Sequence, residues 1–134
     1  FMPSDVAVEV DGERVAKQVD ELPVPHPIYD IGLQTLMRLR PIMMNAGCIL
    51  WNGPASYFEK PAFAFGTIEI LNMCTETTAM TIVGGGHTSA LVNSRGVGDK
   101  VTHNSTGGGA CLQMLCGDEM PVIDALTHSA KKFS

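Results

Sequence analysis

Alternating apolar and polar positions open the chain. Residues 5–10 (DVAVEV) place three valines on one face of an extended segment, and Asp11–Gly12 is a type I′ turn signal before residues 13–19 (ERVAKQV). We therefore expect a β-hairpin near the amino terminus. Residues 22–27 (LPVPHP) contain three prolines, which exclude a helix or an interior strand. This stretch is expected to be an extended connection that ends near Asp30.

Helical and strand-like segments then alternate. Residues 34–46 carry apolar side chains at helical spacing, and Pro41 is expected to kink this helix or to start a second one. Short apolar runs predict strands at 47–51, 79–83 and 99–103. Further helices are expected from Pro61 to about Glu76, over 86–94, over 109–116 and, as a short element, after Pro121. The alternation predicts an α/β fold: a Rossmann-like parallel sheet with crossover helices, a partial doubly wound domain, with the hairpin beside it.

Length and charge limit the classes of function. The 134 residues suit one domain or a piece of one, and beginning at Phe1 suggests a chain cut from something longer. The net charge of −5 provides no basic surface for nucleic acid or an anionic membrane. The longest uncharged runs, 41–58 and 77–94, contain polar residues that a bilayer excludes, and no secretory signal is present. We expect a cytoplasmic protein with no nucleic-acid or membrane partner.

The cysteines and histidines of the chain do not have the spacing that is typical of metal ligands. The four cysteines lack CxxC pairs, so we expect reduced residues packed in the core: Cys48, Cys74, Cys111 and Cys116. Most of the eight methionines are expected in the core as well, and Trp51 behind the sheet. His26, His103 and His128 are expected to be surface or packed residues. No metal site is predicted.

Glycine-rich turns follow the three predicted strands. They are WNGP at 51–54, GGGHTS at 84–89 and NSTGGGA at 104–110. In an open parallel sheet, ligands bind beyond the carboxyl ends of the strands, and glycines let the backbone approach an anion closely. One triple glycine equally fits tight strand-to-helix packing, but two favour phosphate binding. Since neither GxGxxG nor a P-loop is present, backbone N–H groups would bind the phosphate.

The ordered set of motifs resembles the phosphoglycerate kinase family. The resemblance is carried by DIG (30–32), ILWNGPASYFEKPAFAFGT (49–67), TIVGGGHT (81–88) and VTHNSTGGGACLQML (101–115). It implies that residues 1–134 are the carboxyl-terminal portion of the nucleotide-binding domain of a two-lobed glycolytic kinase, without the amino-terminal lobe. The implied reaction is phosphoryl transfer between 1,3-bisphosphoglycerate and ADP, giving 3-phosphoglycerate and ATP. Mg²⁺ would be bound with ADP or ATP, phosphoglycerate would bind through the missing lobe, and the isolated chain would be inactive.

The resemblance also implies roles for single residues. Gly32 would lie beside the adenine, and Glu59 would accept hydrogen bonds from the ribose. The implied nucleotide-binding residues are Gly32, Asn52, Gly53, Pro54, Glu59, Gly84, Gly85, Gly86, His87 and Thr88; the implied catalytic residues are Gly86, Gly107, Gly108 and Gly109. His87 departs from the aspartate that binds the nucleotide's magnesium in most members, and a neutral imidazole is a poor ligand for that ion. The GGGHT form is typical of the archaeal branch of the family.

Two other functions stay open at this point. A nicotinamide-dinucleotide-binding oxidoreductase module would also use glycine turns on parallel strands, although its GxGxxG motif and second-strand acidic residue are missing. A non-catalytic nucleotide-binding or interaction domain would share the fold. Glu59 also has an alternative role. It lies just before Pro61, where its carboxylate could stabilise the N-terminus of a helix through the helix dipole.

Overall fold

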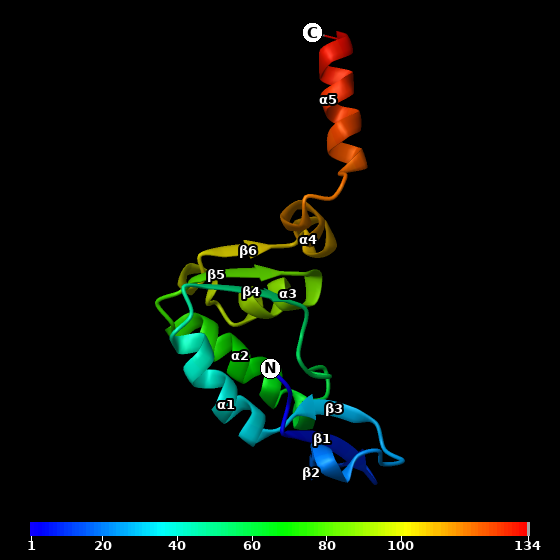
Figure 1. Ribbon diagram of the computed structural model, residues 1–134, viewed down its shortest axis with the longest axis vertical. Helices are drawn as coiled ribbons and strands as arrows, with labels where there is room; N and C mark the ends of the chain where they lie inside the picture. The colour runs from blue at the N-terminus through cyan, green and yellow to red at the C-terminus, as the bar shows by residue number, and fades with distance from the viewer. Residues whose placement is uncertain (134) are drawn as a thin grey trace.

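Two three-stranded sheets form the framework of the computed structural model, which describes residues 1–133 (Figure 1). The antiparallel sheet has the order β2-β1-β3, and the parallel sheet has the order β4-β5-β6. Their bounds are β1 Asp5–Val10, β2 Glu13–Gln18, β3 Ile28–Ile31, β4 Cys48–Asn52, β5 Met80–Gly84 and β6 His103–Ser105. The predicted α/β class, with a parallel sheet, crossover helices and an amino-terminal hairpin, is confirmed.

The hairpin forms where the alternating pattern predicts it, and a third strand joins it. β1 is the central strand, with Val6, Ala7 and Val8 buried. Asp11 and Gly12 have φ values of 49° and 85°, the left-handed conformation that a tight hairpin turn requires. β3 was not predicted. It starts directly after the last proline of the connection and pairs antiparallel with β1, so the extended connection ends earlier than expected.

Three helices lie close to their predicted positions, and only the predicted first residue of the second helix is wrong. α1 spans Leu33–Met44 and continues through Pro41, α2 spans Phe65–Glu76, and α3 spans Gly86–Ser94. The expectation that α2 begins at Pro61 is wrong, because residues 61–63 form a separate 3₁₀ turn. Phe63 N–H donates to Lys60 O at 2.8 Å, a three-residue spacing that an α-helix does not use.

One apolar core joins the parallel sheet to α1, α2 and α3. Trp51 of β4 and Val83 of β5 are buried in it, which confirms the expected burial of the tryptophan. Helix residues complete the cluster, among them Leu36, Met43, Ile70, Leu71, Met73, Leu91 and Val92. Because side chains alternate along a strand, Cys48, Leu50 and Met80 point to the opposite face, where they are exposed.

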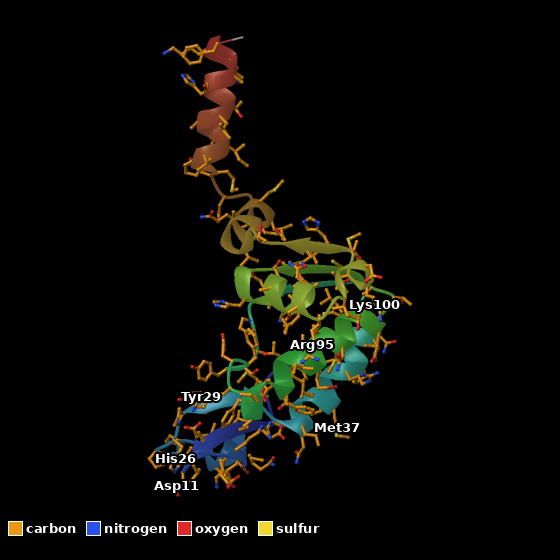
Figure 2. The ribbon with its side chains drawn as sticks, turned by 180° about the vertical axis from the view of Figure 1, so that it is seen from behind. Asp11, His26, Tyr29, Met37, Arg95 and Lys100 are labelled. Atoms are coloured by element: carbon orange, nitrogen blue, oxygen red, sulfur yellow. The ribbon has the colours of Figure 1, made fainter. Side chains whose placement is uncertain are left out.

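The expectation of core cysteines and methionines is only partly correct. Cys74 is buried, and burial raises the pKa of its thiol to about 11. Cys48 and Cys116 are exposed and Cys111 is partly so, which contradicts the prediction for them. Met43 and Met73 are buried, but Met2, Met37, Met80 and Met114 are exposed. Figure 2 shows Met37 at the outer side of α1.

The carboxyl-terminal elements extend from the parallel sheet. β6 lies later than the predicted 99–103, because residues 98–100 form a 3₁₀ turn and Val101 enters the core. α4 (Gly108–Cys116) ends as expected before Gly117, which is left-handed with φ 73°. α5 (Pro121–Phe133) has 13 residues, so it is longer than the short helix expected after Pro121. It projects away from the sheets (Figure 1). Within residues 1–133, every helix is too short or too polar to cross a membrane.

Candidate functional site

The carboxyl ends of β4, β5 and β6 lie side by side. In the parallel register Asn52 is paired with Gly84, and Gly84 with Ser105. Just beyond β4, Gly53 N–H donates to Gly84 O at 3.3 Å. The three glycine-rich turns that the sequence predicts at strand ends therefore meet at one edge of the sheet.

Close contacts between these turns require glycine at particular positions. A Cβ on Gly84 would lie 2.8 Å from Asn52 Oδ1, and a Cβ on Gly108 would lie 3.1 Å from Gly85 Cα. Gly85 also has φ 98°, a conformation that side chains disfavour. By contrast, a Cβ on Gly86 or on Gly109 would meet nothing within 4 Å. Close packing therefore explains why Gly84 and Gly108 are glycines. At Gly86 and Gly109 the space next to the backbone is open.

The amino termini of α3 and α4 begin at these turns. The N-cap residues are Gly85 and Gly107, and neither helix start has a side-chain cap hydrogen bond. The first N–H groups of a helix lack intrahelical partners and carry a partial positive charge. With Gly85 and Gly108 in contact, two such helix ends lie next to each other. This arrangement suits an anion with several oxygens, such as a phosphate group.

Thr88 and His87, both in the first turn of α3, are placed very differently. The Thr88 hydroxyl is completely buried and donates to the carbonyl oxygens of Gly84 and Gly85, so it holds the glycine turn in shape. His87 is exposed, and its side chain makes no hydrogen bond or ion pair within residues 1–133. No group of three His, Cys, Asp or Glu side chains in this range could hold a metal ion. An imidazole and the Asn52 amide oxygen are a poor donor set for Mg²⁺.

Glu59 and Pro54 lie on the loop between β4 and the 3₁₀ turn. Both are exposed, and the Glu59 carboxylate makes no hydrogen bond or ion pair with any described residue. α2 begins only at Phe65 and has no acidic residue in its first turn. Glu59 therefore does not stabilise the start of that helix, and its carboxylate is available to a ligand.

Gly32 lies away from the three strand ends, at the junction of β3 and α1. It is buried, and a Cβ there would lie 2.0 Å from the Cγ atom of Asp5. The Asp5 carboxylate accepts hydrogen bonds from Gln34 N at 3.0 Å and from Thr35 N at 2.7 Å, so it caps α1. Burial would raise the pKa of Asp5, but the Thr35 and Gln34 hydrogen bonds outweigh it and lower the pKa.

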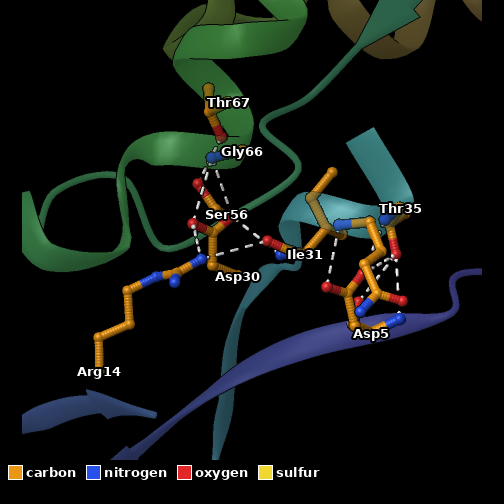
Figure 3. Close-up of polar contacts among 9 residues, drawn as sticks. Asp5, Arg14, Asp30, Ile31, Thr35, Ser56, Gly66 and Thr67 are labelled. Carbon is orange, nitrogen blue, oxygen red and sulfur yellow. Dashed lines mark hydrogen bonds and ion pairs between the residues drawn. The ribbon is translucent and has the colours of Figure 1, made fainter. Parts of the chain in front are cut away.

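Asp30 is a second buried carboxylate that sequence reasoning missed (Figure 3). It accepts hydrogen bonds from Gly66 N at 3.1 Å and Ile31 N at 2.8 Å, and Arg14 Nη2 lies 3.4 Å from its Oδ2. Burial raises the pKa of Asp30, and the three donors reduce that shift without cancelling it. The sequence signals were an acidic residue in an apolar run, IYDIG, and its place in the DIG motif at 30–32, where the resemblance implied a role for the glycine alone.

Comparison with known proteins identifies the family of the chain. The sequence profile described as "Phosphoglycerate kinase" matches residues 1–118. The chain belongs to the phosphoglycerate kinase family. The phosphoglycerate kinase of Methanopyrus kandleri is 44% identical over 126 residues, which are 94% of this chain and 31% of that protein. That of Methanococcus maripaludis is 40% identical over 132 residues, covering 98% of this chain and 32% of the relative.

Solved structures of the family agree. The crystal structure of phosphoglycerate kinase from Pyrococcus horikoshii superposes with a TM-score of 0.83 at 39% identity, over 98% of this chain and 33% of that one. The enzyme from Coxiella burnetii gives 0.82 at 36% identity, over 99% of this chain and 35% of that one. The chain therefore spans about a third of the length of these phosphoglycerate kinases.

Proposed function

We propose that this chain supplies the nucleotide-binding part of a phosphoglycerate kinase, which transfers a phosphoryl group between 1,3-bisphosphoglycerate and ADP to form 3-phosphoglycerate and ATP. The observation that carries the proposal is the contact between Gly108 and Gly85, which brings the uncapped amino termini of α4 and α3 together. Phosphoryl transfer requires donors at the places where equatorial oxygens gather charge. Backbone N–H groups that are already in position need no reorganisation to provide them.

Each predicted residue takes a place in this scheme. The turn at 84–86, held by Thr88, would bind nucleotide phosphates, and the α4 start at 107–109 would face the phosphoryl group in transfer. Glu59 would bind the ribose hydroxyls, as the family resemblance implies, and its carboxylate is exposed and unpaired among the described residues. Asn52, Gly53 and Pro54 would border the nucleotide, and Gly32 the adenine. No general base is required, since the oxygens that exchange the phosphoryl group are anionic or become so.

Magnesium enters this scheme as part of the substrate. The family uses ADP and ATP, generally with Mg²⁺. The turns of this chain offer no carboxylate to the ion, so we assign it to the nucleotide phosphates and water and derive no step from a protein-held metal. His87, exposed on the first turn of α3, is left to face a phosphate oxygen or solvent.

The remaining parts of the reaction lie outside these residues. The relatives are about three times as long, and we propose that the chain is the carboxyl-terminal portion of their nucleotide-binding domain. Phosphoglycerate would then bind to an amino-terminal lobe, which must close on this one to bring donor and acceptor into line. The 134-residue chain by itself should not turn over substrate.

A pair of assays tests the proposal. The full-length polypeptide that contains this chain should form ATP from ADP and 1,3-bisphosphoglycerate in a coupled assay, and the 134-residue chain should not. Calorimetry should show ADP binding to the full-length protein and no binding of reduced nicotinamide dinucleotide. A full-length protein that binds the nicotinamide cofactor and not ADP would contradict the proposal. Turnover by the isolated chain would contradict the need for a second lobe.

A further inference from the structure

Asp30 connects three separate parts of the chain (Figure 3). Its side chain is fully buried at the end of β3. The Gly66 N–H, in the first turn of α2, donates to both carboxylate oxygens at 3.1 Å. Arg14 of β2 approaches from the hairpin at 3.4 Å. A Cβ on Gly66 would lie only 2.2 Å from Asp30 Oδ1, so the close approach of helix and carboxylate depends on glycine.

The loop that carries Glu59 is attached to both sides of this contact. Tyr57 N–H donates to Tyr29 O at 2.7 Å, which joins the loop to the residue before Asp30. The Ser56 and Thr67 hydroxyls are 2.6 Å apart, which joins the loop to the residue after Gly66. Three hydrogen-bonded contacts therefore close a ring through β3, the first turn of α2 and the loop at 53–60.

The ring also shapes a surface hollow. A cavity of about 410 Å³ lies between β3 and the loop, and Tyr29, Asp30, Pro54 and Tyr57 are among its lining residues. Pro54 is one of the residues proposed to border the nucleotide. Gly32, proposed to lie beside the adenine, follows Asp30 by a single intervening residue. The carboxylate thus lies between two segments that a nucleotide would contact together.

We propose that Asp30 is a positioning residue for nucleotide binding: by holding the amino terminus of α2 against β3, it sets the Glu59 loop relative to Gly32. This inference rests on the proposed function. Asp30 itself would touch neither nucleotide nor phosphoglycerate. Its loss should therefore change the Michaelis constant for the nucleotide, because the ribose and adenine contacts shift relative to each other. The phosphoglycerate constant should be unaffected.

The decisive variant is Asp30→Asn in the full-length polypeptide, assayed by steady-state kinetics with the concentration of folded enzyme measured independently. The amide keeps the shape of the side chain but removes a charged acceptor. We expect the KM for ADP to rise several-fold, because the loop and Gly32 lose their relative position, with kcat and the phosphoglycerate KM unchanged. Gly47→Ala serves as the matched control, because a Cβ there meets nothing within 4 Å.

Ser56→Ala is the second variant, and it decides the case if the Asp30→Asn protein does not fold. It removes the contact with Thr67 and leaves Asp30 untouched, so a smaller rise in the ADP constant is expected. A merely structural role would lower the free energy of unfolding or the folded fraction while leaving both Michaelis constants unchanged, and that result would overturn the proposal. Wild-type protein without ADP-dependent activity would instead overturn the proposed function.

Discussion

The Asp5 carboxylate occupies the space in which a side chain on Gly32 would begin. A Cβ on Gly32 would lie 2.0 Å from Asp5 Cγ and 2.2 Å from Asp5 Oδ2. The same carboxylate caps α1 through Gln34 and Thr35, and it also accepts a hydrogen bond from the Thr35 hydroxyl at 2.6 Å. Gly32 has an extended φ of −84°, so it must be glycine for reasons of space and not of backbone conformation.

Gly32→Ala should therefore destabilise the chain. The added methyl group must displace a buried carboxylate that caps a helix, and we expect a loss of about 2 to 3 kcal/mol in the free energy of unfolding. Urea titration of the 134-residue chain measures it. The cost should be smaller when Gly32→Ala is made in an Asp5→Ala background, where the obstruction is gone. Equal costs in the two backgrounds would show that the Asp5 contact is not the cause.

Two neighbouring glycines at the start of α4 should respond differently to alanine. Gly108 is buried, has φ 21° and contacts Gly85, so Gly108→Ala should lower both stability and ADP affinity in the full-length protein. Gly109 is exposed and has open space where a Cβ would lie. Gly109→Ala should leave stability within about 0.5 kcal/mol of wild type and lower kcat. An unchanged kcat would remove Gly109 from the catalytic residues.

Local patterns predicted the elements that have local causes. The hairpin follows from alternation plus the Asp11–Gly12 turn, and α3 from its flanking glycines. β3 escaped prediction because its pairing with β1 is a tertiary contact, and the prolines just before it masked a four-residue strand. β6 (HNS) is polar and short, so the sequence pattern favoured a strand at 99–103, which contains the apolar Val101.

In the candidate site, too, features with a local sequence pattern were predicted and features that depend on tertiary contacts were not. Glycine turns at strand ends were visible in the sequence, and the family resemblance supplied roles for them. Asp5 and Asp30 were not predicted, because their partners Thr35 and Gly66 lie about 30 or more residues away along the chain. Exposure of Cys48 and Met80 was missed for a related reason: composition does not tell which face of a sheet is covered.

Glu59→Ala tests ribose binding. The carboxylate makes no contact with described residues, so the free energy of unfolding should change by less than about 0.5 kcal/mol. Loss of a charge-assisted hydrogen bond should weaken ADP binding to the full-length protein about tenfold, with phosphoglycerate affinity unchanged. Calorimetry measures both, and Glu13→Ala, an exposed carboxylate on the hairpin, is the matched control. If both variants bind ADP like wild type, Glu59 is not a ribose ligand.

The two buried carboxylates should give opposite pH dependences of stability. The folded-state pKa of Asp5 lies below its ordinary value of 3.8, so its contribution is present above that value and is lost as pH falls through the lowered pKa. The folded-state pKa of Asp30 is raised, so the folded state binds the proton more tightly and stability falls as pH rises from 3.8 through the raised pKa.

Urea titrations of the chain at acid to neutral pH separate these contributions. Relative to wild type, Asp5→Asn should lose most stability near neutral pH and the difference should shrink in acid. Asp30→Asn should lose most in acid, with the difference shrinking toward neutral pH, where the wild-type carboxylate is ionised. Parallel curves for wild type and either variant would show that the corresponding group does not change its proton affinity on folding.

His87 stands where the family resemblance implies an aspartate, and its substitutions test where the magnesium is held. The imidazole is exposed on the first turn of α3, and the described residues offer no carboxylate partner that would complete a metal site there. His87→Ala in the full-length protein should therefore keep the magnesium dependence of the reaction. His87→Asp should place a hard oxygen ligand beside the nucleotide phosphates and lower the magnesium concentration needed for half-maximal activity. Gln113→Asp, an exposed change later in α4, controls for the added negative charge. If His87→Ala abolishes the magnesium response while ADP still binds, the imidazole is itself a ligand and the assignment of the ion to the nucleotide is wrong.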